Sequence, residues 1–110
     1  MIQVIIYQGL DKRYNGFQVK GHAGFEDAGK DIVCAAVSVL VINTINAVEE
    51  YTKDRISVLS DEEDGCITCH FRGKPSKEAE LLLKTMVLGL RQMADDDNYA
   101  EYIQLEFEEV

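Results

Sequence analysis

The run from Ile32 to Tyr51 contains neither proline nor glycine, and no charged residue occurs in it before Glu49. Its first half is apolar on nearly every side, and Asn43 and Asn46 bring polarity to its second half. The run is longer than an ordinary strand and lacks breakers, which favours a helix despite its β-branched residues. We therefore predict a buried helix from Ile32 to about Tyr51, with Asp31 before it as the N-cap.

A second helix is indicated after the break at Gly73–Pro75, with Ser76 as its N-cap. Apolar residues recur there at steps of three and four, which is the pattern of an amphipathic helix that buries one face. The acidic run Asp95–Asp97 ends the pattern. The apolar set is Ala79, Leu82, Leu83, Met86, Val87, Leu90, Met93 and Ala94.

Strand patterns surround both helices. We predict strands at about Ile2–Gln8 and Tyr14–His22, and a hairpin of 55–59 and 66–71 joined by an acidic turn at 61–65. A last strand carries Ile103, Leu105 and Phe107 on one face. The order ββαββαβ predicts an α+β two-layer sandwich, with two helices on a largely antiparallel or mixed sheet. We expect residues 1–110 to form one domain.

The charge balance restricts the partners. Eleven Lys and Arg against 20 Asp and Glu give a formal charge of −9, whereas phosphate binding needs a basic face. We therefore expect no direct nucleic-acid partner. Three cysteines suit free thiols in a reducing cytoplasm better than a disulfide framework, and the first residues lack the pattern of a signal peptide. The apolar run 32–42 is too short for a membrane span.

His22 and Cys34 are the candidate catalytic pair. The predicted strand ends at His22, and a loop from Ala23 to Lys30 with two glycines can fold back toward the helix. With Asp31 as the cap, Cys34 lies in the first helical turn, where free amides and the helix dipole stabilise a thiolate. A nearby imidazole supplies the base that a cysteine nucleophile requires. Loop and first-turn amides could also bind an oxyanion.

Other residues near this pair have open roles. Gly21 and Gly24 allow the backbone to approach closely around His22. Asp31 could cap the helix, orient the His22 ring as a third member of a triad, or oppose thiolate formation. Ser38 lies one turn beyond Cys34. A lone cysteine in an apolar helix is more often an inert core residue. The alternative is therefore a non-enzymatic acidic binding module in which Cys34 is a core residue.

The segment around the pair resembles a known family signature. Gly21-His22-Ala23-Gly24-Phe25, followed by Asp31-Ile32-Val33-Cys34-Ala35-Ala36-Val37-Ser38, is similar to the signature of the ribosomal-processing cysteine protease family, Prp. Chain length, element order and acidic character also match, so the resemblance covers essentially the whole chain. Outside the signature the similarity is one of pattern.

The resemblance implies a small homodimeric cysteine endopeptidase, a hydrolase of Gram-positive and related bacteria that needs no cofactor. Such enzymes remove a short N-terminal extension from a large-subunit ribosomal protein precursor. On the alternative interpretation, the acidic module is a binding or assembly factor for such a basic ribosomal protein. In the protease, His22 would be the general base and Cys34 the nucleophile, and Asp31 and Ser38 match further signature positions. The loop with Gly24, Phe25 and Gly29 would cover the bound peptide, which also suits its glycine content. Ile103, Leu105 and the outer face of the second helix are candidates for the dimer interface.

Cys66-Ile67-Thr68-Cys69-His70 matches the C-x-x-C-H pattern of c-type haem attachment. The segment reads as a strand, however, and residues three apart in a strand point to opposite faces. The same geometry opposes a redox pair, and a zinc site would need a second pair of ligands. We therefore expect two ordinary strand cysteines, with no haem and no metal.

Overall fold

The computed structural model describes residues 1–21, 28–61, 63 and 65–110, and it gives only the backbone of 28–31. In these residues the order ββαββαβ is confirmed, with one short 3-10 helix, η1, that was not predicted. The elements are β1 Ile2–Gln8, β2 Tyr14–Lys20, α1 Ala28–Tyr51, β3 Ile56–Asp61, β4 Cys66–Phe71, α2 Lys77–Asp95, η1 Ala100–Tyr102 and β5 Ile103–Glu109.

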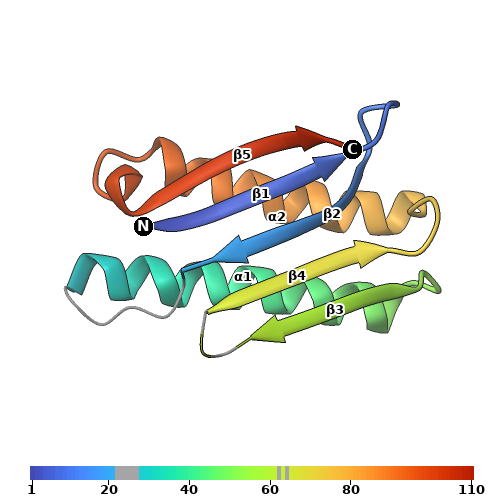
Figure 1. Cartoon of the computed structure of the whole chain (residues 1–110), viewed down its shortest axis with the longest axis horizontal. Helices are drawn as coiled ribbons and strands as arrows, with labels where there is room; N and C mark the ends of the chain where they lie inside the picture. Colours follow the sequence, from blue (N-terminus) through green and yellow to red (C-terminus); the bar gives the residue numbers. More distant parts are fainter. Residues whose placement is uncertain (22–27, 62, 64) are drawn as a thin grey trace.

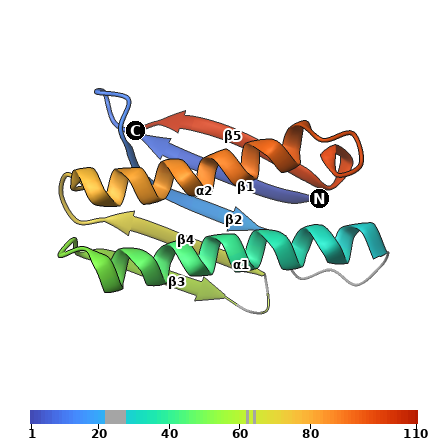
Figure 2. The same cartoon turned by 180° about the vertical axis from the view of Figure 1, so that it is seen from behind.

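The strands form one mixed sheet in the order β3-β4-β2-β1-β5. β5 pairs with β1 in parallel, and every other neighbouring pair in this sheet is antiparallel. Both helices cover the same face of the sheet and run in opposite directions, so the molecule has two layers (Figures 1 and 2). The predicted two-layer α+β sandwich is therefore confirmed.

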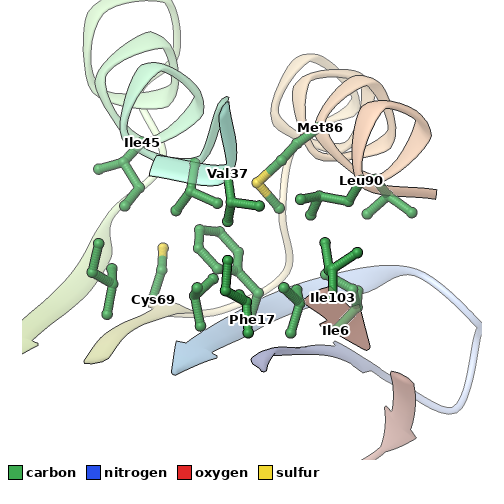
Figure 3. Close-up of a cluster of buried hydrophobic side chains, with 14 of the residues drawn as sticks. Ile6, Phe17, Val37, Ile45, Cys69, Met86, Leu90 and Ile103 are labelled. Atoms are coloured by element: carbon green, nitrogen blue, oxygen red, sulfur yellow. The ribbon is translucent and has the colours of Figure 1, made fainter. Parts of the chain in front are cut away.

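The core lies between the sheet and the helices. Phe17 of β2 is 1% exposed and points toward Val37 of α1 and Met86 of α2 (Figure 3). Alternate residues of β1 are fully buried because successive strand side chains point to opposite faces. The buried side chains of α2 recur at helical spacing, as its amphipathic pattern predicted. They are Ala79, Leu83, Met86, Val87 and Leu90.

The N-terminus of α2 confirms the predicted cap. The Ser76 hydroxyl accepts a hydrogen bond of 3.1 Å from the Ala79 amide, which satisfies one of the free donors of the first turn. The hydroxyl and amide of Ser76 also donate to the Asp54 carboxylate, at 2.5 and 2.8 Å. Partial burial acts to raise the pKa of Asp54, but these hydrogen bonds outweigh it and hold the pKa below its ordinary value. The segment before β3 is thereby fixed to α2.

Helix α1 is less buried than its sequence predicted. Val33, Val37 and Val41 are fully buried against the sheet, whereas Val39 is 69% exposed and Ile42 is 46% exposed. The predicted helix is confirmed, but it is buried on one side only, because a pattern that is apolar all round gives no information about which side packs. By length and composition Ile32–Tyr51 could also cross a membrane, contrary to expectation, but core helices of soluble proteins pass the same test.

Two boundaries differ from the prediction close to the candidate site. β2 ends at Lys20 instead of His22, and α1 begins at Ala28 instead of Ile32. Ala28 is a strong helix former, and Gly29 costs only about 1 kcal/mol inside a helix, so nothing stops the helix from extending toward the N-terminus. In the hairpin, β3 lies slightly later than expected, at Ile56–Asp61, and β4 has the predicted bounds.

Candidate active site

Cys34 is the seventh residue of α1, counted from Ala28, and not part of its first turn. The prediction that Asp31 caps this helix is therefore wrong, since Asp31 is itself a helical residue. The free amides of a helix are those of its first four residues, and the dipole effect falls off within the first turn. The helix terminus thus acts on the Cys34 sulfur less than expected. The side chain of Asp31 lies outside the described part of the structure.

The Cys34 side chain lies at the edge of the core. It is 7% exposed and belongs to the same buried cluster as Val33 and Val37, which face the sheet. Ser38 is half-buried one turn further along the same helix. In contrast, the neighbouring Ala35 is exposed. The thiol is therefore largely covered, and a reacting carbonyl has only a small opening through which to reach it.

Gly21 fixes the chain where β2 ends. Its φ angle is +83°, a region that L side chains rarely adopt, and its amide donates to the Gly65 carbonyl at 3.1 Å. A Cβ at this position would lie 2.8 Å from the Met1 carbonyl oxygen. The predicted close backbone approach at Gly21 is therefore present. It involves β1 and the β3–β4 turn, both at the end of the molecule where α1 begins (Figure 1).

Several predicted site residues fall outside the described part. These are His22, Gly24 and Phe25, so the distance between the imidazole and the Cys34 thiol stays a prediction. Gly29 is described and belongs to α1, so its assignment to a loop is wrong. The proposed covering segment is therefore shorter than the expected 24–30.

The C-x-x-C-H segment forms strand β4, as predicted. Cys69 is 2% exposed and faces the helices, while Cys66 is half-buried on the other face, where its sulfur lies 3.8 Å from the Thr68 hydroxyl. His70 stacks on Tyr7 across the open face of the sheet, with ring centroids 5.3 Å apart. Burial, and then the charge of Glu49, raise the pKa of Cys69 to about 11, which makes it an unreactive thiol near neutral pH.

A shallow apolar groove runs between α1 and α2 on the outer surface and begins at Ala35, the residue after Cys34. It is lined by Ala35, Ala36, Val39, Asn43, Gly89 and Met93, among others. The helices approach closely here, because a Cβ on Gly89 would lie 2.8 Å from Leu40 Cδ2. Sequence reasoning missed this surface. Its signal in the sequence is the absence of charge from Ile32 to Val48, a pattern that equally predicts burial.

Comparison with known proteins decides the family. The family model described as cysteine protease Prp matches residues 1–104. The chain belongs to this family. The ribosomal processing cysteine protease Prp of Staphylococcus aureus is 29% identical over 107 residues, which cover 97% of this chain and 99% of that one. The Bacillus subtilis Prp is 31% identical over 100 residues, or 87% and 89% of the two chains.

Solved Prp structures have the same fold. The S. aureus protease in complex with a substrate peptide superposes with a TM-score of 0.91 at 28% identity, over 98% of this chain and 100% of that one. The same protease with a covalently linked product peptide gives a TM-score of 0.86 at 29% identity, with the same coverage. A Streptococcus mutans protein, SMU.848, gives 0.88 at 30% identity, over 100% and 99% of the chains. As a Prp, this chain is a cysteine protease by family.

Proposed function

We propose that this protein is a cytoplasmic cysteine endopeptidase that removes a short N-terminal extension from a large-subunit ribosomal protein precursor. Membership of the Prp family over residues 1–104 carries the proposal. A covalently linked product peptide in the S. aureus relative supports it, because nucleophilic catalysis proceeds through such adducts. Residues 1–110 act as one protease domain, whose partner is a protein substrate and neither a nucleic acid nor a membrane.

Cys34 is the proposed nucleophile and His22 the proposed general base. His22 removes the thiol proton, and the sulfur attacks the scissile carbonyl carbon to form a tetrahedral intermediate. The C–N bond then breaks, the amine leaves with the proton from His22, and a thioester remains on Cys34. Water, deprotonated by His22, hydrolyses the thioester and restores the thiol. Incubation of the protein with the precursor should give two fragments whose masses locate the cleaved bond.

Gly21, Asp31 and Ser38 are the proposed supporting residues. The positive φ of Gly21, which glycine adopts without strain, turns the chain after β2 and directly before His22 in the sequence. Asp31 lies one helical turn before Cys34, and Ser38 one turn after it. Gly24 and Phe25 belong to the segment that we propose covers the bound peptide, so that water is excluded during acyl transfer.

Thiol reactivity tests the assignment of Cys34 without a substrate. We expect iodoacetamide at pH 7 to alkylate Cys34 faster than Cys66 and much faster than Cys69, with peptide mass spectrometry as the readout. A pKa of about 11 leaves only about 10⁻⁴ of Cys69 as thiolate at pH 7. Burial of Cys69, which is 2% exposed, also keeps the reagent from its sulfur, so Cys69 should be labelled quickly only after the protein is unfolded in urea. His22→Ala should slow labelling of Cys34 alone.

The same measurement tests the alternative function. A non-enzymatic binding module needs no activated thiol, and the 7% exposure of Cys34 suits an inert core residue. Labelling of Cys34 at the Cys69 rate, with no effect of His22→Ala, would favour the binding module over the protease.

We propose further that the protein is a homodimer and that the outer face of α1 is its interface. Val39 and Ile42 are exposed there, and α1 has no charged residue from Ile32 to Val48 to keep that face in water. Of the interface candidates named from the sequence, Ile103 is 3% exposed in the core and is not available. The small side chains Ala35 and Ala36 allow a second copy of the helix to pack closely.

Val39→Glu should convert the dimer to a monomer, because it places a charge in the centre of an apolar contact. Sedimentation velocity over a range of concentrations measures the change. Leu10→Glu is the matched control, since Leu10 is 85% exposed in the β1–β2 turn and should leave the dimer intact. A wild-type protein that is monomeric at every concentration would remove this proposal.

A further inference from the structure

The two edges of the sheet differ in their protection against a further strand. β5 carries exposed Glu106, Glu108 and Glu109, and charged residues on an edge strand oppose pairing with another chain. The opposite edge, β3, has no charge from Ile56 to Ser60 and contains no proline. Charge and proline are common means by which natural sheets prevent an edge strand from pairing, and β3 lacks both from Ile56 to Ser60. β3 is therefore an edge that can pair with another strand.

The register identifies which backbone groups of β3 point outward. The Arg72 amide donates to the Arg55 carbonyl at 2.9 Å, and the two residues are opposite each other in the register of β3 with β4. Hydrogen-bonded and non-bonded pairs alternate along an antiparallel ladder. Ser57 and Leu59 are therefore bonded to β4, whereas the amides and carbonyls of Ile56, Val58 and Ser60 face away from the sheet.

Side chains beside these groups are apolar and accessible. Val58 is 40% exposed and is opposite Cys69, so it lies on the helix side of the sheet. Leu59 is 69% exposed and is opposite Thr68, on the open side. A strand added along β3 would meet apolar surface on both faces of the sheet, so successive apolar side chains of that strand, which point to opposite faces, find partners.

The edge ends in an acidic turn. The sequence 61–64 is Asp-Glu-Glu-Asp, directly after the last outward group at Ser60. β3 runs in the direction of the end of the molecule where α1 begins, and it stops well before that end (Figures 1 and 2). A bound strand therefore extends toward the candidate active site, and lysine or arginine in it would meet opposite charge near the turn.

We propose that the outward edge of β3 binds an extended apolar segment of the protein substrate as an added strand, with basic residues at the end of the segment that lies beside the acidic turn. This rests on the proposed function for its substrate. Backbone hydrogen bonds from Val58 and Ser60 hold the segment, and Val58 and Leu59 select its side chains. The edge thereby supplies binding energy remote from the scissile bond.

Amide hydrogen exchange of the Cys34→Ala protein, with and without the extended ribosomal protein precursor, tests this. In the free protein the amides of Ser57 and Leu59 should exchange slowly and those of Val58 and Ser60 quickly. Saturating precursor should slow Val58 and Ser60 by about tenfold or more, with Ser57 and Leu59 as internal controls. No slowing at Val58 and Ser60, or no binding of the precursor, would overturn the proposal.

A proline variant gives a second readout. Ser60→Pro removes an outward amide that the fold does not use, and proline is tolerated on edge strands. It should lower kcat/KM for the precursor by about tenfold, in line with one lost hydrogen bond, while alkylation of Cys34 and the thermal midpoint stay near wild type. Lys77→Pro is the control, because proline at the first position of α2 costs little and should leave kcat/KM unchanged.

The outcomes separate the two proposals. Edge protection without cleavage by the wild-type enzyme would end the proposed protease function and keep the edge as a binding site. Cleavage with full efficiency by a folded Ser60→Pro variant would end the edge proposal and keep the protease. Protection of Val58 and Ser60 that grows with protein concentration alone would show that a second copy occupies the edge, and this too would overturn it.

Discussion

Cys34→Ala should abolish cleavage of the ribosomal protein precursor, with a loss of kcat/KM of at least about 10⁴-fold. The alanine variant has no atom to attack the scissile carbonyl, so no acyl-enzyme forms. His22→Ala should lose about 10²- to 10⁴-fold, because a small thiolate fraction survives without the base. Fragment masses over a time course give the rates.

Cys66→Ala is the matched control for this experiment. Cys66 is a half-buried thiol on the open face of the sheet, away from the helices, and its loss should leave cleavage unchanged. The far-UV spectrum and thermal midpoint of each variant show that it is folded. A folded Cys34→Ala protein that cleaves the precursor at the wild-type rate would end the assignment of Cys34 as nucleophile.

Phe17→Ala should lower the free energy of unfolding by about 3–5 kcal/mol. Phe17 is 1% exposed and extends from the central strand β2 toward both helices (Figure 3). The truncation removes apolar contacts and leaves a cavity that neither helix can fill without moving. Urea unfolding at constant slope measures the change as a shift of the midpoint.

Phe107→Ala is the control of the same residue type. Phe107 is 42% exposed at the end of β5, where it contacts the rings of Tyr14 and the guanidinium of Arg91 at 6.0 Å. Its removal should cost about 1 kcal/mol or less. Equal losses for the two variants would show that the core is not centred on β2 as the structure describes it.

The sequence predicts the elements well where their periodicity is clear. α2 combines a capping serine, a regular apolar stripe and an acidic end, and both its boundaries and its buried face are as expected. β4 follows from its two-residue period, which also separates Cys66 from Cys69. The order of the strands in the sheet could not be predicted from the sequence. β1 pairs with β5, whose residues are about 100 positions away, and no local sequence pattern indicates such a pairing.

The candidate site is predicted less completely than the fold. The residue types and their spacing are visible, but the start of α1 is not, because Ala28, Gly29 and Lys30 suit a loop or a helix nearly equally. That difference moves Cys34 out of the first turn. The exposed side of α1 could not be predicted for a similar reason. An apolar helix surface has the same sequence pattern whether its own sheet or a second molecule covers it.

The backbone at Gly21 has a consequence for inhibitor design. Any side chain there must accept both a φ of +83° and a carbonyl oxygen 2.8 Å from its Cβ, so every substitution strains the fold. Resistance to an inhibitor commonly arises when a contacted residue is replaced at little cost. A compound that anchors on the main chain at Gly21 would therefore leave the bacterium few escape mutations at that contact.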